Sequence, residues 1–423
     1  MKKINFAKLN HVLIPSTKPA RDRLRKGLFG PLIRPFGAFY DGLTDEGRAL
    51  FLISFIVGGF GIDVHGSDVH VLWSALAALL AGTLVATRFH GLKPFRIEVS
   101  SPRRVTIGEA ITFTLVLHND GAVDRHALRV LGPFLPWDGR WTAPSPRVPG
   151  LAAGAQVRVE ARARFLERGE HHLDPFQVAA LVPLGLTLGP SVSSAGVRFL
   201  VVPKIAAVVR LTTPSGRRHQ PGGVALASKT GESMDLLGVR PYRAGDPVRH
   251  LHARSWARTG SPMVREYQEE YFSRIGVVIE TAVPGADRLE AMLSLAAGVV
   301  AHLARGEALI DLLVAGDRVH DLTLGRHLGF LEQALDLLAC VEARGRPLAA
   351  DAVLSVLSPH LPRLSCVIVV TSTWDNGALA ERIRGFGVGC TTLVVIGDGP
   401  EARGRDVRSI RASAIVAGEA LSL

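Results

Sequence analysis

The residues best suited to chemistry lie in one arginine-rich run, residues 238–270, which reads GVRPYRAGDPVRHLHARSWARTGSPMVREYQEE. Guanidinium groups at this density repel one another unless carboxylates, aromatic faces or a bound anion separate them. A turn is predicted at Gly245-Asp246-Pro247. One interpretation is a surface for a protein partner or an anion, and it has eight candidate residues: Arg240, Tyr242, Arg243, Asp246, Arg249, His252, Arg254 and Arg258.

A structural role for the same run is the alternative. Asp246, Glu266 and Glu269 would then pair with the arginines, while Tyr242 and Trp256 pack and latch the run onto a neighbouring domain. Breaking such a pair would leave a charge without its partner and destabilise the fold. We favour the latch for part of the run and expect at least one arginine to be exposed for an acidic partner.

Motifs for catalysis are missing from the sequence. It has no HExxH, GxSxG or GxGxxG pattern. Residues 223–230 approach a phosphate-binding loop, but Ser228 replaces its second glycine and no strand precedes it. His250 and His252 are a weak metal pair. We therefore expect a non-enzymatic protein without a cofactor, and an enzyme or binder that uses the Arg/His run on a phosphate or carboxylate ligand is the alternative.

Two apolar runs, residues 49–62 and 69–87, lie near the start of the sequence. The second approaches the ~20 residues that span a bilayer, and the first is shorter. Basic residues flank the outer ends of the pair, whereas the connection between the runs has none. The positive-inside bias predicts a transmembrane helical hairpin at 49–88, with both ends of the chain in the cytoplasm. A buried hairpin of a soluble domain is the alternative.

The first 48 residues form a basic leader, in a chain whose formal net charge is +11. Basic segments beside a membrane gain about 1 kcal/mol for each Lys or Arg near anionic lipid. Nucleic acid is a rival partner for such a segment. Because a membrane hairpin follows it, we expect contact with lipid and none with nucleic acid.

Residues 92–204 show the period-two pattern of half-buried strands. Residues 157–165 alternate apolar and charged positions, and residues 95–99 and 111–117 alternate in a similar way. Turn residues separate these runs. Several short strands in about 110 residues predict a β-sandwich of the immunoglobulin-like kind.

Residues 273–423 alternate continuous apolar runs with segments of helical spacing. The apolar runs are residues 274–280, 308–314, 366–372 and 391–396. Strands covered on both faces read in this way, and helices between them imply a mainly parallel sheet. The expected organisation is therefore leader, hairpin, sandwich, a signature region at 205–272, and an α/β domain.

The run at 238–270 resembles the signature of the bacterial domain-of-unknown-function 58 family. LTDEGRAL at 43–50 and the stretches 168–176 and 183–185 are similar to other family patterns. This resemblance implies a von Willebrand factor A-like α/β domain and anchorage in the inner (cytoplasmic) membrane with most of the chain cytoplasmic. It also implies an interaction module that works with a MoxR-type AAA+ ATPase in complex assembly or envelope function.

Von Willebrand A-like domains often hold a divalent metal through a DxSxS motif. The matching positions here are Glu280, Ala282 and Pro284, so both hydroxyls are replaced. Thr371, Ser372, Thr373 and Asp375 could supply oxygens from a later loop. Hard cations need several oxygen ligands, and we therefore expect no metal at this edge.

Overall fold

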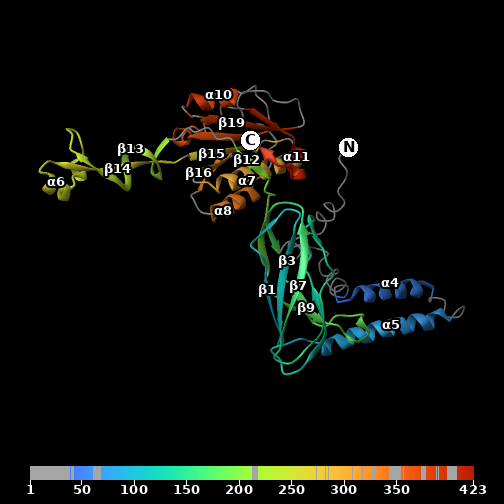
Figure 1. Cartoon of the computed structure of the whole chain (residues 1–423). Helices are drawn as coiled ribbons and strands as arrows, with labels where there is room; N and C mark the ends of the chain where they lie inside the picture. Colours follow the sequence, from blue (N-terminus) through green and yellow to red (C-terminus); the bar gives the residue numbers. More distant parts are fainter. Residues whose placement is uncertain are drawn as a thin grey trace. The chain divides into compact units, whose positions relative to one another are not determined.

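The structure is a computed structural model (Figure 1). It describes residues 39, 42–60, 68–211, 218–272, 274–281, 283, 285–306, 308–315, 319–324, 329–342, 354–355, 357–372, 378–386, 388, 390–397 and 407–423. The chain divides into two compact units, Met1–Val201 and Val202–Leu423. Residues 1–38 of the predicted basic leader lie outside the described residues.

Both apolar runs form helices, as predicted. Helix α4 (Asp45–Phe60) and helix α5 (Val69–Ala86) run side by side, and the short 3-10 helix η1 (Thr87–Phe89) continues α5 (Figure 1). Within the described residues, one helix, Val69–Phe89, is long and apolar enough to cross a membrane. A second span at α4 stays a prediction. Helix α4 has 16 residues and its first turn carries acidic side chains, so its apolar part is shorter than the ~20 residues required.

Large apolar side chains of both helices are exposed. In α4, Leu52 is 59% and Phe55 72% exposed, and in α5 Val71 and Leu72 are 57% and 55% exposed. Helices of soluble domains turn such residues toward a core. An exposed apolar surface of this kind is unfavourable in water and is typical of a surface that contacts a membrane or another protein.

The β-sandwich follows the hairpin in the same unit, and its strands are antiparallel. One sheet has the order β1-β3-β7-β5 and a second the order β10-β9-β4-β6, while three strands form a third sheet, β2-β11-β8. The bounds are β1 Arg96–Ser100, β2 Arg104–Thr106, β3 Ala110–His118, β4 Arg125–Leu131, β5 Gly139–Trp141, β6 Arg147–Leu151, β7 Gln156–Phe165, β8 Gly169–Leu173, β9 Gln177–Ala180, β10 Val192–Ser193 and β11 Val197–Val202.

Alternating side chains make the core of this sandwich. Along β3, Ile111, Phe113, Leu115 and Leu117 are buried, whereas the residues between them are partly exposed. Phe113 contacts Phe199 edge-on, with ring centroids 5.7 Å apart. Side chains of all three sheets belong to one hydrophobic cluster. The predicted β-sandwich is therefore confirmed by the pairing and burial of its own strands.

A six-stranded sheet organises the second unit, in the order β17-β16-β15-β18-β19-β20. Its strands are parallel except β17, which pairs antiparallel with β16 at the edge. The edge strand β17 follows β16 through a short connection and was not predicted. The bounds are β15 Arg274–Glu280, β16 Leu309–Ala315, β17 Val319–Leu324, β18 Cys366–Thr371, β19 Cys390–Ile396 and β20 Val407–Ile410.

Helices cover both faces of this sheet (Figure 1). Helix α7 (Ala286–Leu303) packs on β15, β18 and β19, with α8 (Gly329–Ala339) beside it, and α10 (Ala378–Gly385) packs on the other face. Helix α11 (Ala412–Ala417) contacts α7, and β12 (Val208–Arg210) pairs with β21 (Leu421–Ser422). Because both faces are covered, the central strands are buried along their length.

Candidate functional site

The signature run forms an antiparallel hairpin with a helical tip. Strand β13 (Arg218–Pro241) pairs with β14 (Met263–Phe272), and the register near the tip joins Arg240 to Val264. Between the strands lie the 3-10 helix η3 (Val248–His250) and helix α6 (Ala253–Thr259). We call residues 238–266 the signature tip. No feature of the sequence alone had predicted this hairpin.

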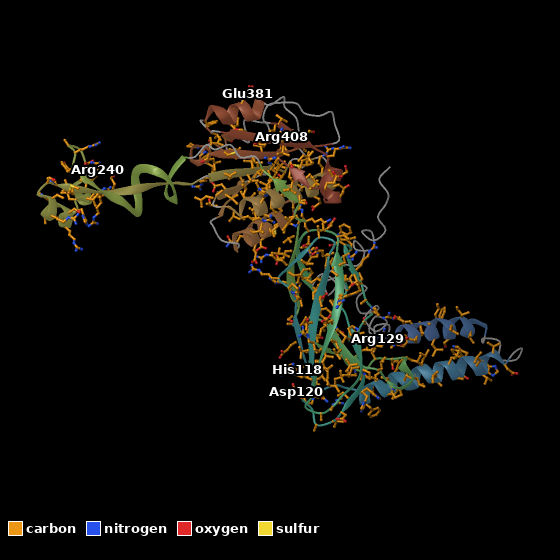
Figure 2. All side chains as sticks on the ribbon, in the orientation of Figure 1. His118, Asp120, Arg129, Arg240, Glu381 and Arg408 are labelled. Carbon is orange, nitrogen blue, oxygen red and sulfur yellow. The ribbon has the colours of Figure 1, made fainter. Side chains whose placement is uncertain are left out.

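One arginine organises the base of the signature tip. The side chain of Arg240 lies at the signature tip (Figure 2). Its guanidinium donates to both oxygens of Asp246, from Nη1 at 2.7 Å and Nη2 at 2.7 Å, and from Nε to Glu266 at 2.9 Å. Asp246 also accepts the backbone N–H of Arg243 at 2.7 Å. These contacts, the Arg240 hydrogen bonds first, lower the pKa of Asp246 to about 2, and Asp246 in turn raises the pKa of Arg240. The network closes the turn after β13.

This network corrects part of the latch hypothesis. Asp246 and Glu266 were expected to pair with the other candidate arginines, but both bind Arg240. The side chain of Glu269 lies outside the described part of the structure. Among the described side chains, Arg243, Arg254 and Arg258 are exposed and form no ion pair. Arg249 is also exposed and donates from Nε to His250 Nε2 at 3.1 Å.

Apolar and aromatic side chains are exposed beside these arginines. Tyr242 is 39%, Val248 71% and Trp256 43% exposed. Trp256 therefore packs less fully than the latch hypothesis assumed. Helix α6 places Arg254 and Arg258 four residues apart, which puts them on one face. The signature tip thus combines exposed cationic groups with exposed apolar surface.

His252 and Ser255 form the contact most similar to a catalytic pair. His252 Nδ1 lies 2.7 Å from Ser255 Oγ. His252 is the N-cap of α6 and Ser255 the third residue after it, so the contact joins two side chains at the start of the helix. A nucleophile–base pair also needs a third group that orients the base. Among the described residues, no carboxylate takes that role beside His252.

The carboxyl edge of the parallel sheet holds a buried carboxylate. Glu280 at the end of β15 is 7% exposed, and Thr371 at the end of β18 donates its hydroxyl to Glu280 Oε2 at 2.5 Å. The predicted positions Ala282, Pro284, Thr373 and Asp375 lie outside the described residues. Within the described part of the chain, no cluster of three or more His, Cys, Asp or Glu side chains could hold a metal ion.

The structure therefore brings together only some of the predicted site residues. Arg240, Asp246 and the backbone of Arg243 meet in one network, and His252 joins Ser255 instead. Sequence reasoning named Glu266 but did not assign it to Arg240. The turn predicted at Gly245-Asp246-Pro247 was the signal for this contact. Gly245 has φ 103°, and the turn brings Asp246 back toward β13, which carries Arg240.

No protein-family model matches the chain, and no curated protein matches it. Solved structures share similarity with about a quarter of the chain. A fragment of alpha-2-macroglobulin from Escherichia coli is 21% identical over 27% of this chain, at a TM-score of 0.21, and the chain spans 18% of that fragment. The CARDB domain of a Pyrococcus furiosus protein is 11% identical over 26% of this chain and 87% of that domain, at a TM-score of 0.18.

A third solved structure is the PKD domain of an M14-like peptidase from a Thermoplasmatales archaeon. It is 11% identical over 25% of this chain and 92% of that domain, at a TM-score of 0.16. At these scores the similarity assigns neither family nor activity. The β-sandwich rests on the strand pairing described above.

Proposed function

We propose that the chain is a membrane-anchored, non-enzymatic interaction module of the domain-of-unknown-function 58 type. Its signature tip binds an acidic face of a protein partner, which the family resemblance suggests is a MoxR-type AAA+ ATPase. Its second unit, with five parallel strands and covering helices, acts as a von Willebrand A-like scaffold for that tip.

The proposal rests on a difference between one bonded arginine and three exposed ones. Arg240 holds Asp246 and Glu266, so the tip keeps its shape through one internal network. Arg243, Arg254 and Arg258 stay exposed, without an ion pair among the described side chains. A guanidinium fork binds carboxylates in two-point geometry. Exposed Tyr242 and Trp256 provide the apolar area that anchors interfaces.

The exposed apolar hairpin supports the membrane anchor. Helix Val69–Phe89 is long enough to span a bilayer, and its side chains are mostly exposed. Helix α4 lies beside it and has a shorter apolar part. Arg88 and Lys93, which follow α5 in the chain, are basic residues of the kind found on the cytoplasmic side. The inner membrane is the compartment that this arrangement fits.

Charge reversal at the tip tests the proposed function. Full-length protein carrying Arg254→Glu or Arg258→Glu would be used to capture partners from detergent-solubilised membranes. Arg164→Glu, an exposed arginine of the sandwich strand β7, is the matched control. We expect at least tenfold less captured partner for the tip variants, unchanged thermal melting, and a weaker salt dependence of binding.

Two results would reject the docking face. If Arg254→Glu and Arg258→Glu capture the partner as well as Arg164→Glu does, the exposed arginines do not bind it. If both lose capture and melting stability together, their role is structural. Saturable binding of inorganic phosphate that Arg254→Glu abolishes would favour the alternative, a ligand site on the Arg/His run.

A further inference from the structure

The loop between β9 and β10, residues 181–189, carries an exposed leucine in an unusual conformation. Leu184 is 71% exposed and has φ 73°. A non-glycine residue adopts this left-handed conformation at a cost of about 1–2 kcal/mol. Glycine follows at position 185 with φ 69°, yet position 184 keeps a large apolar side chain. In water, neither the strain nor the exposure of Leu184 is compensated.

Hydrogen bonds hold this loop against the base of the helical hairpin. The Thr44 N–H donates to Leu186 O at 3.0 Å, and the Thr44 hydroxyl donates to Gly185 O at 2.7 Å. The Thr187 hydroxyl donates to Thr83 O in α5 at 3.2 Å. The loop is therefore fixed to both helices, where α4 begins and where α5 approaches its end.

These contacts set the depth of the loop along the apolar helix. Thr83 precedes Phe89, the last residue of helix Val69–Phe89, by six residues, or about 9 Å at 1.5 Å per residue. The 21 residues of that helix match the ~30 Å hydrocarbon thickness. A span that uses the whole helix places Thr83 inside the boundary near Phe89. A loop that is bonded to Thr83 from the sandwich side then reaches the outer edge of the hydrocarbon, next to the membrane interface.

The backbone of the loop is suited to that environment. Irregular backbone is tolerated at membrane depth only where the protein satisfies its hydrogen bonds. Protein carbonyls accept most of the loop's N–H groups: Leu181 to Ala127, Val182 to Thr187, Gly185 to Val182, Leu188 to Gly42 and Gly189 to Ala180. The exposed side chain of Leu184 is thus carried by a turn that needs little water.

We propose that the loop of residues 181–189 enters the interfacial zone of the bilayer and inserts Leu184 there. The inference rests on the proposed membrane anchorage of the hairpin. Phe89, 82% exposed at the end of the same apolar helix, enters the same zone. Exposed Arg88 and Lys93 flank Phe89 in the chain and meet anionic headgroups. The sandwich is thereby seated on the membrane surface by its own loop as well as by the helices.

Single labels on the full-length chain measure this depth. Cys340, Cys366 and Cys390 would be replaced by Ala, and one cysteine introduced by Leu184→Cys, Leu79→Cys or Leu166→Cys and labelled with an environment-sensitive fluorophore. The protein is reconstituted into phosphatidylcholine–phosphatidylglycerol vesicles. Leu79 lies in α5 and is 40% exposed. Leu166 is 50% exposed and directly follows the last residue of β7. The first residue of β7, Gln156, pairs with His118 of β3, which in turn pairs with Arg96 at the start of β1, the strand that follows the helices. Leu166 therefore lies about 30 Å along β7 from the end of the sandwich that is joined to the helices.

We expect the labels at 184 and 79 to be quenched by brominated lipid and protected from iodide, and the label at 166 to be quenched by iodide. Iodide quenching at 184 equal to that at 166, with 79 still in lipid, overturns the loop inference and leaves the anchorage standing. Iodide quenching at 79 as well overturns both. Pro183→Cys, exposed in the same loop, gives a second reporter in case Leu184→Cys fails to fold.

Discussion

Asp246 shows how one carboxylate can shape a cationic surface. Its carboxylate accepts hydrogen bonds from both terminal nitrogens of Arg240 and from the backbone N–H of Arg243. One arginine is therefore committed to structure, and the others are presented outward. The positive charge of Arg240 is thereby balanced by two carboxylates, and solvent screens the exposed arginines.

At this residue, Asp246→Asn should loosen the signature tip without unfolding the units. The variant removes the charge that Arg240 binds, so we expect amide hydrogen exchange within residues 238–266 to become about tenfold faster. Exchange measured by mass spectrometry checks this. Asp120→Asn, an exposed carboxylate of the sandwich that lies 3.6 Å from Arg96, should leave exchange in the tip unchanged.

Acid should have the same effect on the wild-type tip. The pKa of Asp246 is lowered from 3.8 to about 2 by its bonds to Arg240 and Arg243. Its contribution to stability is therefore complete above the unfolded pKa and is lost as the pH falls through the folded one. Limited pepsin digestion should cut the tip increasingly between about pH 4 and pH 2. A cleavage rate in the tip that stays flat across that interval would contradict the expectation.

At the scale of elements, the sandwich contains a buried titratable pair between β8 and the residues before β5. His171 Nε2 lies 2.9 Å from Asp138 Oδ2, and the two side chains are 11% and 4% exposed. The imidazole stacks on Phe199, with ring centroids 5.6 Å apart. Burial lowers the pKa of His171, but the hydrogen bond and charge of Asp138 outweigh it, so the pKa is raised from 6.5.

A raised histidine pKa makes the sandwich more stable at acidic than at basic pH. The contribution of the charged pair is complete below the unfolded pKa and is lost as the pH rises through the folded value. We expect the wild-type sandwich to melt at a lower temperature above that pH. Asp138→Asn should remove this pH dependence and cost about 3 kcal/mol, because it breaks a buried pair. Calorimetric melting of the wild type and of Asp138→Asn across the neutral pH range measures this pH dependence. If the melting temperature of Asp138→Asn depends on pH as that of the wild type does, another group causes the dependence.

The first turn of α4 is joined to the sandwich by close backbone contact. A Cβ atom at Gly47 would lie 2.0 Å from Leu186 O. Gly47→Ala should therefore destabilise the unit by about 1–3 kcal/mol through overpacking, although alanine favours helices. Gly59→Ala on the same helix meets nothing within 4 Å and should stabilise by up to about 1 kcal/mol. Thermal unfolding in detergent compares the melting temperatures of the two variants. Equal changes in melting temperature would show that the close contact at Gly47 does not affect stability.

At the scale of the whole molecule, the proposed topology places the β-sandwich and the second unit in the cytoplasm and the connection between the apolar helices outside. A cysteine introduced at Ser67, with the native cysteines replaced, should react with a membrane-impermeant thiol reagent in intact cells. The exposed sandwich position Leu166→Cys should react only after the cells are opened. Labelling of position 166 but not 67 in intact cells would reverse the orientation.

The sequence alone determined many of the regular elements of this protein, although not β17 or the β13–β14 hairpin. Period-two burial fixed strands such as β7, and continuous apolar runs located β15 and β18 within a residue or two, because these patterns express which faces exclude water. The tertiary structure decided what joins them. The Arg240 network, the His171–Asp138 pair and the contact of Gly47 with Leu186 each link residues whose partners depend on how the chain returns in space. The local pattern of apolar and polar residues indicates which positions are buried. Which side chains pair depends on contacts between residues that are distant in the sequence and that only folding brings together.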